Sequence, residues 1–207
     1  MSEAPAIDAP VAGKREATKA ANRAAILAAA RVVFADIGFG AASVRDIIRR
    51  TDLATGTFYN YFPDKESVLR EILDETTIEI RLRVRAARQD AASVEDFVRN
   101  GFRAYFDYLA GDREMLELMS RNAGTIRAMF DEPAVGAGVE ELRLDLERGV
   151  ADGILVEHDS ELMAAAMVGA GVEVGMRLFE RAPVDVDGAV ALLTGVFAPS
   201  LAGHAAA

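Results

Sequence analysis

The stretch SVRDIIRRTDLATGTFYNYFPDKESVL, residues 43–69, decides how this chain folds. It contains two short apolar patterns of helical period, at 44–50 and 54–62, with the break Thr51-Asp52-Leu53 between them. Two short helices joined by a break of about three residues are typical of a helix-turn-helix unit. The stretch therefore predicts a bihelical module, and the rest of the chain can be placed around it.

Polar residues mark the ends of these predicted helices. Ser43 precedes the first pattern and Asp46 follows three residues later, which is close to a capping box. Pro63 ends the second pattern, and Asp64 is placed to cap the longer helix that follows.

The pattern at 54–62 has two different faces when it is drawn as a helix with about 100° between neighbours. Phe58 and Phe62 share one side and are expected to pack in a core. Gly56 and Asn60 fall on the opposite side, where a glycine allows close approach and an amide can pair with an adenine edge in the DNA major groove. Periodicity alone fits a short core helix equally well; the helix-turn-helix spacing favours the DNA-binding interpretation.

Charge is distributed unevenly along the chain, whose net charge is −10. Residues 14–65 hold nine basic and five acidic side chains, a net charge of +4. From Asp90 onward nine arginines face 21 acids, a net charge of −12. A basic amino-terminal module on an acidic body can bind a polyanion on one face, so charge permits DNA binding without establishing it.

Helical patterns continue along the whole chain, and the sequence predicts an all-α fold of about nine helices. We expect a flexible tail at 1–15, a helix-turn-helix domain at 16–66 and a helical ligand-binding and dimerisation domain at 67–207. EPAVGAG, residues 132–138, reads as the clearest internal loop. The last two helical patterns run over 161–180 and 186–199.

The segment 24–72, from the apolar helix ending in FADIGFGAAS to the run GTFYNYF-x-x-KE, resembles the helix-turn-helix signature of the TetR/AcrR family of transcriptional regulators. The resemblance implies an all-α homodimer that joins through its last two helices, with the second short helix as the recognition helix. It assigns phosphate contacts to Ser43, Tyr59, Tyr61 and Lys65, and base contacts to Thr55, Gly56, Thr57 and Asn60. Asp52 departs from the family glycine in the turn, and Ala54 departs from the usual capping serine.

Apolar side chains of the carboxy-terminal half could line an effector cavity, although ordinary core packing is the favoured alternative for any one of them. The candidates are Phe102, Tyr105, Phe106, Leu109, Met115, Met119, Met129 and Met167, with Asn122 as a partner for a ligand's polar group. Small residues at Ala165, Ala166, Gly169, Ala170 and Gly175 are expected to permit close helix approach across a dimer interface.

Several function classes are disfavoured. The chain has no cysteine and two histidines, so thiolate zinc sites and cysteine nucleophiles are excluded and no metal or cofactor is expected. No nucleophile, base or metal set is clustered, which argues against an enzyme. The most apolar stretch, from Leu162, contains Glu173 and Arg177 and reads as a buried or interface helix instead of a membrane span. The start lacks a signal peptide, so we expect a cytoplasmic protein.

These patterns together predict a ligand-responsive, DNA-binding transcriptional regulator. We expect a repressor that binds a pseudo-palindromic double-stranded operator as a homodimer. A small hydrophobic effector, of fatty-acyl or other type, would release it. The alternative is a helical ligand carrier or interaction protein in which DNA binding is lost or secondary.

Overall fold

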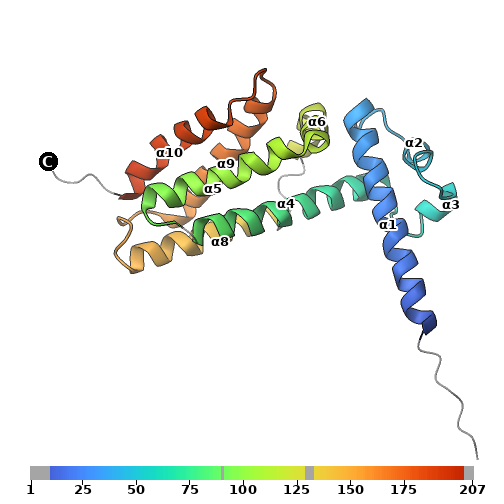
Figure 1. Ribbon diagram of the computed structural model, residues 1–207, viewed down its shortest axis with the longest axis horizontal. Helices are drawn as coiled ribbons and strands as arrows, with labels where there is room; N and C mark the ends of the chain where they lie inside the picture. The colour runs from blue at the N-terminus through green and yellow to red at the C-terminus, as the bar shows by residue number, and fades with distance from the viewer. Residues whose placement is uncertain (1–9, 90, 129–132, 203–207) are drawn as a thin grey trace, which may run out of the picture. The chain divides into compact units, whose positions relative to one another are not determined.

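The structure, a computed structural model, describes residues 10–89, 91–128 and 133–202, and in these ranges it contains ten helices and no strand (Figure 1). The all-α prediction is therefore confirmed. In chain order the helices are α1 (Pro10–Ile37), α2 (Val44–Ile48), α3 (Thr55–Phe58), α4 (Lys65–Gln89), α5 (Val94–Gly111), α6 (Arg113–Arg121), α7 (Ala123–Ala128), α8 (Pro133–Ala151), α9 (Ser160–Phe179) and α10 (Val186–Ala202).

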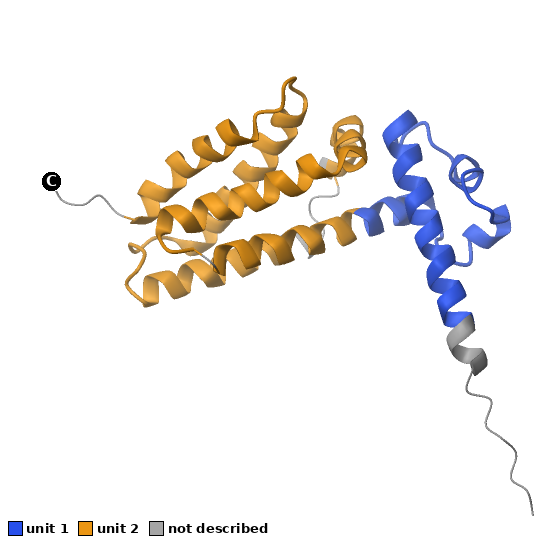
Figure 2. Ribbon diagram, viewed as in Figure 1, with its two compact units in different colours: residues 1–72 blue, residues 73–207 orange. Residues whose placement is uncertain are grey.

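The chain divides into two compact units, residues 1–72 and 73–207, and the boundary falls inside α4 (Figure 2). The amino-terminal unit holds α1 to α3 and the first turns of α4. The carboxy-terminal unit holds the remainder of α4 and the helices α5 to α10.

The amino-terminal unit is held together by a small core to which all four of its helices contribute. Ile26 and Phe34 of α1, Ile47 of α2, Phe58 of α3 and Leu69 of α4 are completely buried. Fully burying one such side chain contributes roughly 1.5–3 kcal/mol. The apolar period of each short segment therefore fixes which of its faces is left for the solvent.

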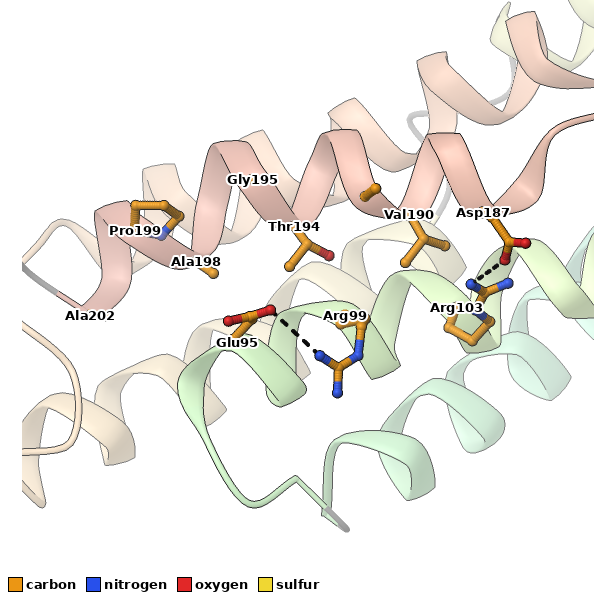
Figure 3. A pocket seen from close by; sticks show the side chains of 11 residues that line it. Glu95, Arg99, Arg103, Asp187, Val190, Thr194, Gly195, Ala198, Pro199 and Ala202 are labelled. Carbon is orange, nitrogen blue, oxygen red and sulfur yellow. Dashed lines mark hydrogen bonds and ion pairs between the residues drawn. The ribbon is translucent and has the colours of Figure 1, made fainter.

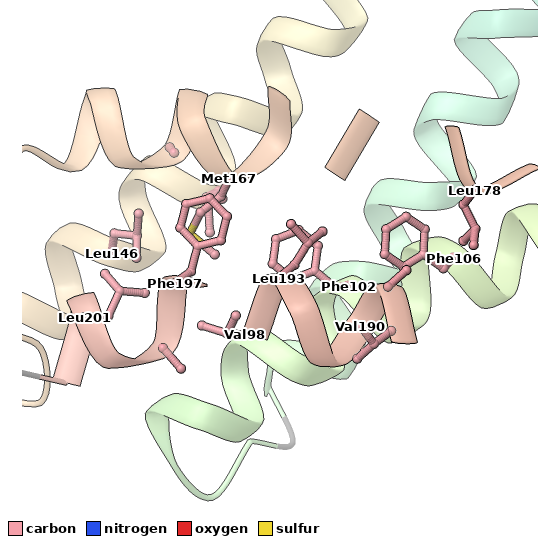
Figure 4. Packing of buried hydrophobic residues seen from close by; sticks show 14 residues of the cluster. Val98, Phe102, Phe106, Leu146, Met167, Leu178, Val190, Leu193, Phe197 and Leu201 are labelled. Atoms are coloured by element: carbon pink, nitrogen blue, oxygen red, sulfur yellow. The ribbon is translucent and has the colours of Figure 1, made fainter. Parts of the chain in front are cut away.

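The carboxy-terminal unit is built from two pairs of neighbouring helices. Helix α5 packs along α10, and α8 packs along α9. Aromatic rings fill the space between them: Phe102 stacks on Phe106 at 6.4 Å between ring centroids and lies 5.9 Å from Phe197 (Figure 4). Met167 from α9 and Leu146 from α8 are buried in the same cluster.

Helix α9 approaches α5 closely because two of its buried positions are glycines. A Cβ atom at Gly171 would lie 3.3 Å from the Phe102 ring, and one at Gly175 would lie 3.4 Å from the Tyr105 hydroxyl oxygen. Gly175, which we expected at a dimer interface, thus faces rings of its own chain. Ala165, Ala166 and Gly169 are exposed on the same helix.

By length and composition α9 could span a membrane, and it is the one helix of the described ranges that meets both criteria. It carries a Glu173–Arg177 ion pair at 3.2 Å and packs against α5, α8 and α10. These features fit the prediction of a buried or interface helix.

Two ion pairs join α4 to α8. Arg88 lies 2.9 Å from Asp145, and Arg81 pairs with Glu141. The Arg88 side chain is 9% exposed, and its guanidinium lies over the Phe97 ring. Burial lowers the pKa of Arg88, while the Asp145 carboxylate acts in the opposite direction.

The observed helices differ from the predicted ones at several places. Helix α1 begins at Pro10, inside the segment expected as a tail, because proline suits the first turn of a helix and alanines follow it. Ten helices replace about nine because the pattern after Arg113 is interrupted at Asn122, which ends α6. The predicted loop at 132–138 is wrong from Pro133 onward, where α8 starts. Helix α10 continues past Pro199.

Candidate nucleic-acid interface

Helix α2 begins with the capping box that the sequence predicted. The Ser43 hydroxyl accepts a hydrogen bond from the Asp46 backbone N–H, and the Asp46 carboxylate accepts one at 2.9 Å from the Ser43 N–H. The Ser43 hydroxyl also donates to the Asp46 carboxylate, which holds the pKa of Asp46 below its ordinary value. Because its proton is engaged, Ser43 would have to leave Asp46 before donating to a phosphate.

Helix α3 is shorter than the predicted helix at 54–62. It covers Thr55–Phe58, and hydrogen-bonded turns continue it: Tyr61 N–H donates to Phe58 O, and Phe62 N–H donates to the same oxygen. Ala54 offers no side-chain cap, which is one reason for the short helix. The predicted division into faces is kept, since Phe58 is 0% and Phe62 is 4% exposed.

The outward face of α3 and of the turn that follows it consists of polar side chains that have no hydrogen-bond partner in the described part of the chain. Thr55, Tyr59 and Asn60 are exposed, Thr57 is half-buried, and none of the four makes a hydrogen bond through its side chain to a described residue. Gly56 is exposed, and a Cβ atom built there would meet nothing within 4 Å. The fold therefore does not require glycine at this position, although close approach of a ligand would.

Tyr61 is hydrogen-bonded to Asn22 of α1, a residue that the sequence did not mark as part of the site. The Asn22 side-chain Nδ2 donates to the Tyr61 hydroxyl oxygen at 3.0 Å. Since the phenol accepts this bond, its own proton is left to donate elsewhere. The spacing of 39 residues hides this contact from any local pattern.

Lys65 lies against the protein itself. Its ammonium donates to Phe39 O at 2.7 Å and to Ala42 O at 2.8 Å, and it sits 4.5 Å from the centre of the Phe39 ring. These carbonyl oxygens compensate the cation in the first turn of α4, where the helix dipole disfavours it. A phosphate contact by Lys65 stays a prediction that would use the remaining N–H.

The departure from the family pattern at Asp52 has a mild local effect, and the cap predicted at Asp64 is present. No residue other than glycine has a positive φ in the described ranges, so Asp52 occupies the turn without the left-handed conformation that favours glycine. Asp64 caps α4 as predicted, with its carboxylate accepting from the Ser67 N–H at 2.7 Å.

The residues predicted to line an effector pocket are mostly packed in the core. Phe102, Phe106 and Met167 belong to one buried cluster (Figure 4), and Met115 is completely buried. The Asn122 amide donates to Leu118 O at 2.7 Å. Met129 lies outside the described residues.

The structure brings three of the predicted pocket residues together around one small cavity. Tyr105, Leu109 and Met119 line it with Gly175 and Phe179, and its volume is about 20 Å³. A space of this size holds about one water molecule. Burial raises the pKa of the Tyr105 phenol, so the hydroxyl remains a protonated donor at this cavity.

A larger groove lies between α5 and α10, and the sequence did not point to it (Figure 3). Its volume is about 570 Å³, with Arg99, Arg103 and Asp187 at its edge and small residues such as Ala191 and Gly195 along α10. Arg103 pairs with Asp187 across the groove at 2.6 Å. The charges at 95, 99 and 103 recur every four residues and could have marked this face.

The geometry of residues 43–62 defines a class of protein: a helix-turn-helix DNA-binding regulator with a separate helical body. Residues 26–72 match the family model described as "Bacterial regulatory proteins, tetR family". Residues 26–72 therefore form the DNA-binding domain of the TetR family, a family of transcriptional regulators and not of enzymes.

Solved structures with the same fold cover nearly the whole chain. The fatty acid degradation regulator FadR from Bacillus halodurans is 23% identical, with a TM-score of 0.73 over 85% of this chain and 94% of that one. FadR from Bacillus subtilis, solved in complex with stearoyl-CoA, is 20% identical, with a TM-score of 0.74 over 86% and 98%. The ketosteroid regulator KstR2 of Mycobacterium tuberculosis is 17% identical, with a TM-score of 0.63 over 88% and 96%.

Proposed function

We propose that this regulator is a homodimeric, cytoplasmic repressor that reads a pseudo-palindromic operator and is released by a hydrophobic effector. The observation that carries the proposal is the unpartnered outward face of α3. Thr55, Thr57 and Asn60 present hydrogen-bonding groups that the described part of the chain leaves unused. Polar groups in such a position gain most from a partner that offers matching donors and acceptors.

The residues of the face have separate roles in this proposal. Asn60 makes paired hydrogen bonds to a base, Thr55 and Thr57 contact bases through hydroxyl or methyl groups, and Gly56 lets the backbone come close. Tyr59 and Tyr61 donate to phosphates and fix the register, with Ser43 and Lys65 as further phosphate contacts.

Dimerisation is proposed through α9 and α10. Leu162 on α9 is 67% exposed, and Leu192 and Val196 on α10 are 59% and 53% exposed. A second copy of the chain would cover these side chains by a self-complementary contact, as in most twofold dimers. The dimer would place two recognition helices in major grooves about one helical turn apart, or somewhat more.

The proposed effector is a hydrophobic molecule, with a fatty-acyl thioester as the first compound to test. Support comes from the aromatic core of the carboxy-terminal unit and from the stearoyl-CoA complex of the Bacillus subtilis relative. The cavity at Tyr105 and Met119 is about 20 Å³, so such a ligand would have to open the packing around it. A ligand that binds the opened arrangement more tightly shifts the population toward it, and DNA affinity falls if that arrangement fits the operator poorly.

The DNA proposal is tested by selecting bound sequences from a random library with the wild type and Asn60→Ala in parallel. We expect the wild type to recover an inverted repeat and the variant to relax one position of each half-site. Only weak, sequence-independent binding by the wild type would contradict the proposal and favour the ligand-carrier alternative.

The effector proposal is tested with the operator recovered in that way. Stearoyl-CoA, free CoA and stearate are titrated into the complex of operator with wild type or Met119→Trp. Release by stearoyl-CoA that is lost in the variant supports the cavity at Met119 as the binding site. Equal release from both proteins removes Met119 from the proposal.

A further inference from the structure

The first half of α1 extends beyond the core of the amino-terminal unit (Figure 1). The helix starts at Pro10, whereas its first fully buried side chain is Ile26 and the family match also begins at residue 26. Residues 15–21 are all exposed. This half of the helix is therefore not needed to close the helix-turn-helix core, and another reason for it can be sought.

One face of α1 changes its chemistry along its length. Arg15, Lys19, Asn22 and Ile26 follow one another at steps of four, three and four residues, so they share one side of the helix. Ile26 is buried, and Asn22 contacts Tyr61. The side of α1 that packs on the helix-turn-helix thus continues beyond the contact of Asn22 with Tyr61, and there it carries the basic residues Arg15 and Lys19.

Two basic side chains of this extension, Arg15 and Lys19, have no partner in the described part of the chain, unlike the next arginine along the helix. Neither Arg15 nor Lys19 forms an ion pair or hydrogen bond with a residue in the described ranges. Arg23 instead pairs with Glu71 and lies over the Phe62 ring. Arg15 and Lys19 lie about 10 Å and 5 Å along the helix from Asn22, toward its amino-terminal end.

We propose that the first half of α1 is a backbone clamp on DNA. Arg15 and Lys19 bind phosphates just outside the half-site that α3 reads, and Asn22 positions Tyr61 for its own phosphate. The proposal rests on the function proposed above, because it assumes that Tyr61 lies on the side of the module that faces DNA. Charge complementarity selects the partner: two unpaired cations in line with a phenol donor suit a nucleic acid strand.

The role of Asn22 follows from the direction of its hydrogen bond. The amide donates to the phenol oxygen and thereby leaves the phenol proton for a phosphate oxygen. An aspartate at 22 would accept that proton and add a negative charge. Asn22 is thus a positioning residue, whose effect on DNA passes through Tyr61.

The clamp is tested by measuring operator affinity of the full chain as a function of salt. The test variant is Arg15→Ala/Lys19→Ala. The matched control is Arg121→Ala/Arg181→Ala, which also removes two exposed cations that have no ion pair in the described ranges. Loss of two phosphate contacts per subunit should reduce the slope of log Kd against log salt by about 1.8 per subunit, and the control should leave it unchanged. Hydroxyl-radical footprinting should show protection outside the half-sites that only the test variant loses.

The positioning role is tested with Asn22→Asp beside Tyr61→Phe. Both should weaken operator binding without changing which sequence is selected, and Tyr61→Phe should make a further Asn22→Asp change less harmful than it is alone. Thermal unfolding checks that both variants fold. Wild-type binding by Asn22→Asp overturns the role of Asn22.

The clamp and the function on which it rests can fail separately. An unchanged salt slope and footprint in Arg15→Ala/Lys19→Ala, with operator selection still dependent on Asn60, overturns the clamp and leaves the regulator intact. If the wild type selects no sequence at all, the proposed function fails first and the clamp fails with it.

Discussion

Helix α3 presents polar side chains that have no partner in the described chain, whereas α5 presents rings that are already packed. The side chains of Thr55 on α3 and of Asn60 in the turn after it make no hydrogen bond to a described residue, while Phe102 and Phe106 on α5 sit in the main cluster of the carboxy-terminal unit. A surface that binds a polar ligand is left unsatisfied by its own fold, and so it can be recognised before the ligand is known. A site for an apolar ligand resembles the hydrophobic core, because its side chains pack against each other when the ligand is absent.

The largest effect is expected from Phe106→Ala, which tests whether the rings on α5 are packed as core. If the ring is core, the variant loses about 3–5 kcal/mol in free energy of unfolding. Urea titration measures this loss. The control Ile154→Ala removes apolar volume from a side chain that is 64% exposed and should change stability by less than about 0.5 kcal/mol. A small cost for Phe106→Ala would mean that the ring borders space that a ligand can use.

Asn60→Ala tests whether the polar side chains of the recognition segment bind DNA. The variant should lower operator affinity without lowering stability. Loss of a paired base contact costs about 1–3 kcal/mol per half-site, or about 5- to 150-fold in affinity. The melting temperature should stay the same, because the Asn60 side chain has no partner in the described ranges. A fall in stability that matches the fall in affinity would show that Asn60 serves the fold.

Gly56→Ala separates fold and function at a single position. The added methyl meets nothing within 4 Å, and alanine is favoured over glycine inside a helix by roughly 0.5–1 kcal/mol. We expect stability to hold or rise while operator affinity falls. Gly124→Ala is the matched control, since its Cβ is equally unobstructed in α7 and it should leave DNA binding unchanged. Full operator affinity in Gly56→Ala would place the backbone of α3 away from the bases.

The smallest effect is expected at the two Ser-Val-x-Asp caps, one in each unit. Hydrogen bonds from Ser43 lower the pKa of Asp46, and one from Ser93, followed by the charge of Arg99, lowers that of Asp96. The stability that these carboxylates contribute is present above the unfolded pKa of about 3.9 and is lost as pH falls through the lower folded pKa. Ser43→Ala and Ser93→Ala should therefore be less stable than wild type at pH 7, and this difference should shrink below about pH 4.

Thermal unfolding of the wild type and of both cap variants, at pH 7 and below about pH 4, measures this difference in stability. Ser120→Ala, an exposed serine on α6, is the control. A difference between wild type and the cap variants that is equal at both pH values would contradict the proposed link to the carboxylates.

Local chemistry explains what could be predicted. The capping box at Ser43, the cap at Asp64 and the burial of Phe58 all depend on residues within a few positions of each other, and each was found as expected. The DNA-facing side of α3 follows from the same local period, although its contacts remain a prediction.

Contacts between distant residues explain what the sequence missed. Asn22 meets Tyr61 across 39 residues, and Lys65 reaches two carbonyl oxygens before Ser43 that no pattern marks as its partners. Likewise Gly175 faces Tyr105 inside the same chain, because the packing of α9 on α5 cannot be deduced from its small residues alone. The start of α8, residues 133–138, was predicted as a loop because its glycines and proline were given more weight than the alanines and valine around them.

The empty space around Gly56 has an evolutionary consequence. A Cβ atom added there meets nothing within 4 Å, so the fold exerts little selective pressure against a small side chain at that position, and under the proposed function selection acts on the residue mainly through the operator. The side chains of Thr55 and Asn60 likewise make no hydrogen bond to a described residue. If these positions read the operator as proposed, a lineage carrying this scaffold can acquire new target genes through a few codons without first acquiring compensating changes elsewhere, whereas any change at Gly175 would have to be accommodated by the rings against it.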